Sequence, residues 1–217
     1  KGSKKGQLAI AQENTEDNLA SKIKLLNNNK IELTGEESVA IYGKRAEIDN
    51  KGSISVGEKS AAIYLVEDNG GKTLAGSAKN NGLITLGEYS SGMLYKAETT
   101  GKYTTLDGGI FNFNEIKSTA KNVIGMNFES SLDSKKIINE TTGKIELTGE
   151  YSIGMYASGN GNYEIQNLGQ ILMASSSELK TPSIGIYTNN KNSLIKNKGL
   201  ISVGDKSIGT YGYSINT

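Results

Sequence analysis

One short segment recurs along the chain, and it constrains the fold more than any other feature. Its clearest copy runs from Gly143 to Tyr156, with the sequence GKIELTGEYSIGMY. Six further copies follow the same order of an alternating apolar pair, a turn, a serine and a second apolar run; they begin near Lys30, Gly52, Gly82, Gly109, Gly169 and Gly199. A repeat of this length indicates a solenoid, in which each unit buries its apolar face only against its neighbours.

The first apolar pair of each copy has the period of a β-strand. The pairs are Ile31/Leu33, Ile54/Val56, Ile84/Leu86, Phe111/Phe113, Ile145/Leu147, Ile171/Met173 and Ile201/Val203. The residue between the two is polar in six of the seven copies. This alternation predicts a half-buried strand with the paired residues facing inward.

Two more strands are predicted in each copy. The second carries pairs that we also expect to face inward: Val39/Ile41, Ile153/Met155 and Ile184/Ile186. The third is weaker, spans segments such as residues 46–49, 163–166 and 193–196, and is followed by an asparagine two residues before the next glycine (Asn50, Asn80, Asn167 and Asn197). Tyr42 and Tyr64 lie only 22 residues apart, so three short strands form one coil. We therefore predict an all-β parallel β-helix with three short strands per coil and about seven coils.

We expect residues 1–217 to be a single β-helix segment cut from a longer rod, because the chain opens and closes in mid-coil. Residues 7–11 resemble a second strand, and the stretch from Thr15 to Leu26 is expected to be a loop with at most a helical turn. The expected repeats lie near residues 29–50, 51–80, 81–108, 109–138, 139–166, 167–196 and 197–213.

The composition excludes several classes of site. The chain contains no Cys and no His, which rules out thiolate and imidazole metal sites, cysteine nucleophiles and Ser–His triads. The formal net charge is +1 and the single arginine is Arg45, which argues against nucleic acid as a partner. No apolar stretch approaches the roughly 20 residues that span a bilayer, so we expect no membrane insertion by this segment. We predict no cofactor and no metal.

Candidate catalytic patterns are weak. Residues 52–60 and 199–207 approach a phosphate-binding loop, but an acidic residue precedes the lysine in each, and both are ordinary repeat copies. The outward carboxylates of Glu32 and Glu146 lie four coils apart, roughly 19 Å, whereas catalytic carboxyl pairs are about 5–10 Å apart. Glu67 and Asp68 are expected on a solvated loop. We therefore predict no catalytic residues and no enzyme.

Tyrosines at similar positions of the second strand are the candidate binding residues. We expect them to form one outward column of Tyr42, Tyr64, Tyr95, Tyr156, Tyr187 and Tyr211. Such a column suits sugar or protein binding, whereas ring stacking that stiffens the rod explains it without a ligand. Expanded loops are alternative sites of specificity; they span residues 12–22, 65–72, 96–103, 115–121, 157–162 and 175–182.

The repeat also resembles a known family. Residues Asn197 to Tyr211 follow the pattern N-x-G-x-I-x-V-G-x-x-S-x-G-x-Y. This pattern is similar to the passenger repeats of type V autotransporters, and most like those of the large fusobacterial adhesins, over residues 29–213. The resemblance implies a right-handed parallel β-helix, display on the bacterial surface or secretion, and a C-terminal β-barrel translocator outside this chain.

The resemblance further implies adhesion to glycans or proteins of host cells or other bacteria. It transfers no binding residue. Two alternative functions stand beside it, a passive structural spacer and a carbohydrate-active β-helix enzyme.

Overall fold

The computed structural model describes residues 1–13, 23–67, 76–97, 108–133 and 135–216. These residues form 23 β-strands and contain no helix. Every strand pairs in parallel with the equivalent strand one coil away, so the strands fall into three sheets.

Each sheet takes every third strand of the chain. Sheet B contains β1 (Leu8–Glu13), β4 (Val39–Lys44), β7 (Ala61–Glu67), β10 (Ser91–Ala97), β13 (Ile124–Ser130), β16 (Ile153–Ser158), β19 (Ile184–Thr188) and β22 (Ile208–Tyr211). Sheet C contains β2 (Lys24–Asn27), β5 (Glu47–Asn50), β8 (Ser77–Asn80), β11 (Gly109–Asn112), β14 (Lys136–Asn139), β17 (Glu164–Asn167), β20 (Leu194–Asn197) and β23 (Ile215–Asn216). Sheet A contains β3 (Lys30–Leu33), β6 (Ser53–Val56), β9 (Leu83–Leu86), β12 (Glu115–Ser118), β15 (Lys144–Leu147), β18 (Gln170–Met173) and β21 (Leu200–Val203).

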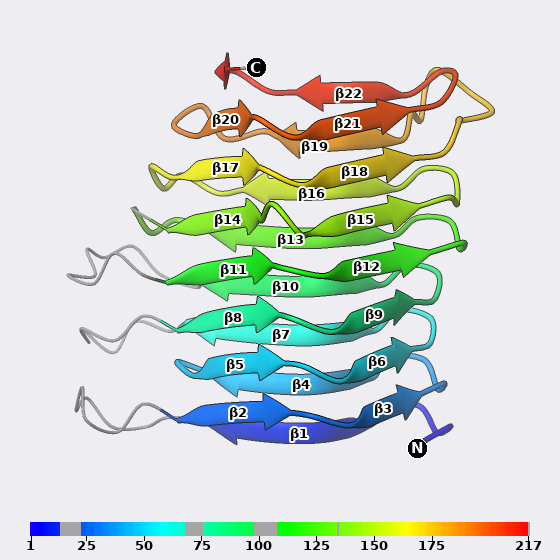
Figure 1. Cartoon of the computed structure of the whole chain (residues 1–217), viewed down its shortest axis with the longest axis vertical. Helices are drawn as coiled ribbons and strands as arrows, with labels where there is room; N and C mark the ends of the chain where they lie inside the picture. Colours follow the sequence, from blue (N-terminus) through cyan, green and yellow to red (C-terminus); the bar gives the residue numbers. More distant parts are fainter. Residues whose placement is uncertain (14–22, 68–75, 98–107, 134, 217) are drawn as a thin grey trace.

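The three sheets enclose a narrow core along a rod. One strand from each of sheets B, C and A makes a coil, and seven such triplets run from β1–β3 to β19–β21, followed by β22 and β23. Figure 1 shows the coils stacked from the N-terminus at the bottom to the C-terminus at the top, with sheet B behind and a right-handed path. Right-handed crossovers are the rule for parallel strands. The predicted right-handed, three-stranded β-helix of about seven coils is confirmed.

The inward side chains form continuous aliphatic columns. In sheet A the residues Ile54, Ile84, Ile116, Ile145 and Ile171 are buried in successive coils. Sheet C contributes Ile48, Ala78, Ile110, Ile137, Ile165 and Ile195 in the same way. A core one coil thick needs few apolar residues per strand, which reconciles this fold with a hydrophobic fraction of only 35%.

A ladder of asparagines lies at the corner where sheet C ends and sheet A follows. Its members are Asn27, Asn50, Asn80, Asn112, Asn139, Asn167 and Asn197. The Nδ2 of each donates to the Oδ1 of the next at 2.7–2.9 Å. The amides of Asn112, Asn139 and Asn167 also donate to backbone carbonyls at the start of the next sheet A strand. A primary amide both donates and accepts, so a stack of identical residues satisfies itself.

The predicted first strand at Phe111/Phe113 is wrong. Residues Gly109–Asn112 form β11 in sheet C, where Ile110 is buried and Asn112 joins the asparagine ladder. The sheet A strand of this coil is β12, so the expected loop at 115–121 contains a strand. The expected loop at Thr15–Leu26 likewise ends in a strand, since residues 24–26 belong to β2; residues 14–22 lie outside the described part of the chain.

The inward assignment of Val39, Ile153 and Ile184 in the second strand is also wrong. These residues are half-buried on the outer face, and two consecutive residues after each face inward. In β16 these are Gly154 and Met155. A Cβ on Gly154 would lie 2.7 Å from Cγ2 of Ile171, so the first of the two inward positions accepts only a very small residue.

A buried ion pair replaces the solvated carboxylate predicted at Glu67. Glu67 is the last residue of β7, and its carboxylate lies 3.3 Å from Nζ of Lys135, with both side chains at most 1% exposed. The other carboxylate oxygen accepts a 2.6 Å hydrogen bond from the backbone N–H of Gly76. Burial raises the pKa of the Glu67 carboxyl, against the opposing effects of the Lys135 ammonium and the Tyr95 hydroxyl. Asp68 lies outside the described residues.

The asparagine ladder yields a first prediction. Asn139→Ala should lower the free energy of unfolding by at least about 2 kcal/mol, because it leaves the Nδ2 donor of Asn112 and the Oδ1 acceptor of Asn167 buried without their ladder partner. Asn114→Ala, at an exposed asparagine that makes one bond to the Asn81 carbonyl, should cost under about 0.5 kcal/mol. Equal shifts of the two urea midpoints would contradict a structural role for the ladder.

The assignment of faces in β15 yields a second prediction. Ile145→Asp places a charge in the core and should cost at least about 3 kcal/mol, since Ile145 is fully buried. The neighbouring outward change, Glu146→Ser, should cost under about 0.5 kcal/mol. Chemical denaturation of both variants is the measurement, and matching midpoints would show that the strand is turned the other way.

The buried ion pair yields a third prediction. Glu67→Gln removes the negative charge beside the buried Lys135 ammonium and should cost about 3 kcal/mol. The double variant Glu67→Gln/Lys135→Met removes both charges but keeps an acceptor for the Gly76 N–H, and it should recover most of that loss. A double variant as unstable as the single one would mean that the pair itself, rather than charge balance, holds these coils together.

Candidate functional site

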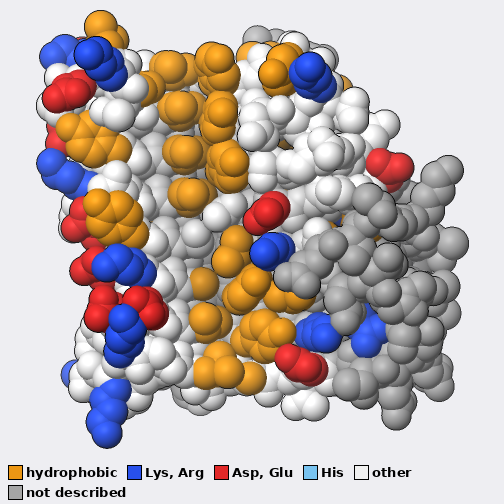
Figure 2. Space-filling model, turned by 180° about the vertical axis from the view of Figure 1, so that it is seen from behind, with side chains coloured by type: hydrophobic (Ala, Val, Ile, Leu, Met, Phe, Trp, Pro, Cys, Tyr) orange, Lys and Arg blue, Asp and Glu red, His pale blue; other side chains and the backbone are white. Residues whose placement is uncertain are grey.

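The outer surface of sheet B carries two parallel columns of outward side chains, most of them half-buried. The apolar column, in register from coil to coil, consists of Val39, Ala61, Ser91, Ile124, Ile153, Ile184 and Ile208. The tyrosine column beside it consists of Tyr42, Tyr64, Leu94, Asn127, Tyr156, Tyr187 and Tyr211. Figure 2 shows apolar side chains gathered in columns along this side of the rod. We refer to the two columns together as the sheet B face.

The structure brings five of the six predicted tyrosines onto this face, in two groups. Tyr42 and Tyr64 form an edge-to-face pair with centroids 5.6 Å apart. The rings of Tyr156, Tyr187 and Tyr211 follow one another at 5.5 Å. These separations lie within the range of favourable aromatic contacts, so the rings stabilise one another as well as the surface they present. Leu94 and Asn127 separate the two groups.

Tyr95 does not belong to the tyrosine column. Its side chain is fully buried and stacks on Phe128 of the next coil, with centroids 4.4 Å apart and planes 9° apart. Phe128 in turn meets Tyr163 edge to face at 5.0 Å. Tyr95 is therefore part of an internal aromatic cluster and cannot contact a partner of the sheet B face.

The register of the serines identifies the tyrosine-column residue in this coil. Buried Ser38, Ser60, Ser90 and Ser152 precede the sheet B strands, and their hydroxyls accept hydrogen bonds from backbone N–H groups of the preceding coil. Tyr64 lies four residues after Ser60. Counting four residues from Ser90, the equivalent serine of the next coil, gives Leu94, whereas counting from Ser91 gives Tyr95. Sequence periodicity does not reveal the apolar column, because two consecutive inward residues in the sheet B strands break the alternation of inward and outward positions.

Charged pairs border this face at the corner between sheets A and B. Lys5 pairs with Glu37 at 2.6 Å, Lys59 with Glu58 at 2.8 Å, and Lys121 with Glu150 at 2.6 Å. The hydrogen bond from Lys121 contributes most to lowering the pKa of the Glu150 carboxyl. The face thus has an apolar centre with a charged border, which is the usual composition of a protein interaction surface.

Glu32 and Glu67, two carboxylates with clearly shifted pKa values, are poorly suited to act as a general acid. No group of three or more acidic residues in the described segments could hold a metal ion. Hydrogen bonds from Lys30 and then Lys1 lower the pKa of Glu32 to about 2, whereas a general acid needs a raised pKa. Glu67 has a raised pKa but is enclosed in the core. Glu32 and Glu146 share an outward column four coils apart, as predicted.

The remaining sequence candidates are ordinary parts of the coils. Both segments that resemble phosphate-binding loops contain a sheet A strand, β6 or β21, and lead into a further strand rather than a helix. Of the expected loops, residues 14–22, 68–72 and 98–103 lie outside the described part, while residues 65–67 and 157–158 belong to strands. The described segments also contain no helix of the length and apolarity needed to cross a membrane.

Comparison with known proteins places this architecture in a family. A family model described as the BigA third pectate lyase-like domain matches residues 1–217. BigA is a bacterial surface protein, and a pectate lyase-like domain is a parallel β-helix, in agreement with the three sheets described above. No curated protein and no solved structure matches the chain. The chain therefore belongs to the family of the BigA third pectate lyase-like domain.

Proposed function

We propose that this domain is a rod-like adhesive segment of a bacterial surface protein, which binds glycans or proteins of host cells or other bacteria without chemical turnover. The observation that carries the proposal is the sheet B face, a largely apolar and aromatic surface that extends along a stack of coils and is interrupted at Ser91 and Asn127. Monomeric proteins rarely expose a long apolar patch unless it contacts a partner. The family supports display on the cell surface, by a passenger-type rod of this kind.

The sheet B face also suits this role mechanically. Apart from Ile208 and Tyr211 on the terminal strand β22, its side chains lie on strands that are hydrogen-bonded on both sides, so a partner meets a surface that loses little conformational entropy on binding. Tyrosine is well suited to such contacts because its ring is apolar and its hydroxyl forms hydrogen bonds. A passive spacer would need the stacking of the rings but not the half-buried outward isoleucines Ile153 and Ile184 beside them.

A carbohydrate-active enzyme is the second candidate, because the family is pectate lyase-like. Such an enzyme would need a general acid or base that reaches the substrate. Release of reducing or unsaturated sugar ends from polysaccharides by the purified domain would support this candidate and overturn the non-enzymatic proposal.

Binding assays with matched tyrosine variants test the proposal. The purified domain should bind a subset of bacterial or epithelial cells or a glycan array, and Tyr156→Ser/Tyr187→Ser should weaken that binding at least tenfold, about 1.4 kcal/mol. Tyr89→Ser, at a 56% exposed tyrosine outside the face, should bind like the wild type. Absence of binding by the wild-type domain, or equal effects of the two variants, would favour a spacer.

A further inference from the structure

The sheet B face has a two-part arrangement along the rod. In the tyrosine column, two strands without an outward tyrosine, β10 and β13, lie between two pairs of strands that carry one, β4 with β7 and β16 with β19. A two-fold axis placed between β10 and β13 relates β10 to β13, β7 to β16 and β4 to β19 of a second copy that runs in the opposite direction. An interface of this kind requires a surface that is complementary to itself under the rotation.

The apolar column meets this requirement. Its members before the midpoint are smaller than those after it: Val39, Ala61 and Ser91 on one side, Ile124, Ile153 and Ile184 on the other. With the two rods antiparallel, each member of the first set lies opposite the member of the second set at the same distance from the midpoint, so that Ala61 of one copy meets Ile153 of the other. A small side chain opposite each isoleucine lets the two columns interdigitate, as the inner faces of packed sheets do.

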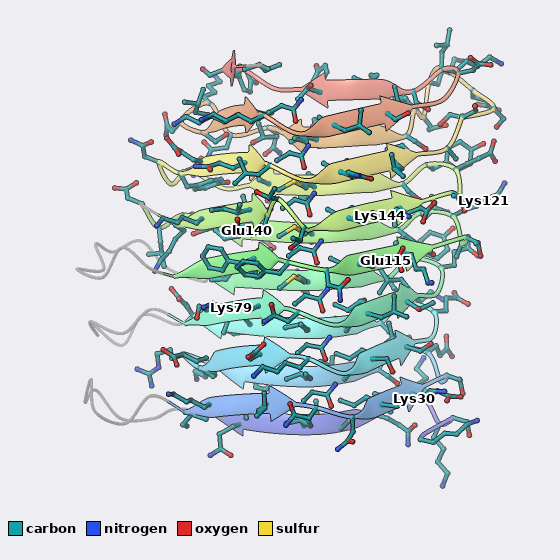
Figure 3. All side chains as sticks on the ribbon, viewed as in Figure 1. Lys30, Lys79, Glu115, Lys121, Glu140 and Lys144 are labelled. Atoms are coloured by element: carbon teal, nitrogen blue, oxygen red, sulfur yellow. The ribbon has the colours of Figure 1, made fainter. Side chains whose placement is uncertain are left out.

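Opposite charges lie at the midpoint on both borders of the face. Two residues after the tyrosine column, Lys96 of β10 and Glu129 of β13 are neighbours in register, and the rotation places Lys96 of one copy opposite Glu129 of the other. At the corner with sheet A, Glu88 precedes β10 and Lys121 precedes β13, and Figure 3 shows Lys121 at this corner. The rotation brings Glu88 of one copy to the level of Lys121 of the other.

A parallel arrangement of two copies lacks this complementarity. A two-fold axis along the tyrosine column would turn the apolar column of one copy onto the position two residues after the tyrosine column of the other. Ile124 would then meet Glu129, and Ile153 would meet Ser158. The antiparallel arrangement is the one that buries apolar side chains against apolar side chains.

The face is large enough for a specific dimer. Eight strands about 4.8 Å apart, with about 3.3 Å per residue over the six residues of a strand such as β4, give a face of roughly 35 Å by 20 Å. Two such faces in contact bury on the order of 1,400 Å², which is close to the size of a standard protein interface.

We propose that the sheet B face pairs with the sheet B face of a second copy of this domain, with the rods antiparallel and the two-fold axis between β10 and β13. An antiparallel pair joins rods that project from opposite directions, as those of two neighbouring cells do. The inference rests on the proposed function, since it names a protein partner for the adhesive face.

Sedimentation of the whole domain over a range of concentrations tests the pairing. The wild type should form a reversible dimer, and Ile153→Lys should weaken the dimer at least about tenfold, because it places a charge in the apolar centre of the interface. Leu172→Lys, at a half-buried outward leucine of sheet A, should dimerise as the wild type does. A strictly monomeric wild type, or equal weakening by the two variants, would overturn the proposal.

An exchange of charges tests the orientation. Lys96→Glu/Glu129→Lys keeps opposite charges facing each other in its own dimer, so it should dimerise as the wild type does. A wild-type copy would face an exchanged copy with like charges, so mixed dimers should be at least about fivefold rarer than random pairing gives. Native mass spectrometry of an equal mixture, with one protein isotope-labelled, measures this proportion. Mixed dimers at the random proportion would contradict the antiparallel register.

The outcomes separate this inference from the proposed function. If the domain is monomeric but binds cells or glycans through its tyrosines, the self-pairing fails and the adhesive function stands. If the domain dimerises with this register but binds no glycan and no cell that lacks the domain, the self-pairing stands and adhesion to other partners fails.

Discussion

The structure depends on stacking each side chain on its equivalent one coil away, about 4.8 Å along the rod. At that spacing a column must be compatible with itself, because each residue's main contacts above and below are residues of the same position. Aliphatic columns meet this requirement by packing, and the asparagine ladder meets it because each amide donates upward and accepts from below. The same requirement lets a chain with few apolar residues form an ordered core.

This self-compatibility explains which features the sequence could reveal. Where a column is uniform, as for Ile54, Ile84 and Ile145, the alternating pattern is repeated often enough to identify both the strand and its inward face. In the fourth coil, formed by β10 to β12, the repeat pattern indicated the wrong segment. Ser118 interrupts the aliphatic pair of the actual sheet A strand, while residues 109–113 imitate such a pair with two phenylalanines. The recurring asparagine was visible in the sequence. The ladder could not be predicted from it without knowing that these asparagines all lie at the same corner of their coils.

Other features could not be predicted because they depend on contacts between coils that are not neighbours. Glu67 reaches Lys135 past Ala97, which pairs with Glu67 in the coil between them and has only a small side chain. Tyr95 was assigned to the outward column for a different reason. Its neighbour Leu94 lies in the tyrosine column, and a shift of one residue along a strand turns an outward ring into the core.

The departures from the repeat are not spread evenly, and this bears on function. The coil formed by β10, β11 and β12 contains the inward Tyr95, the Leu94 that interrupts the tyrosine column, and the Ser118 that interrupts the aliphatic column. A rod selected only for length would gain stability from uniform columns throughout. A coil that gives up uniformity where it faces a potential partner is better explained by selection for a surface than by selection for stacking, and this coil lies where the sheet B face divides into two tyrosine groups.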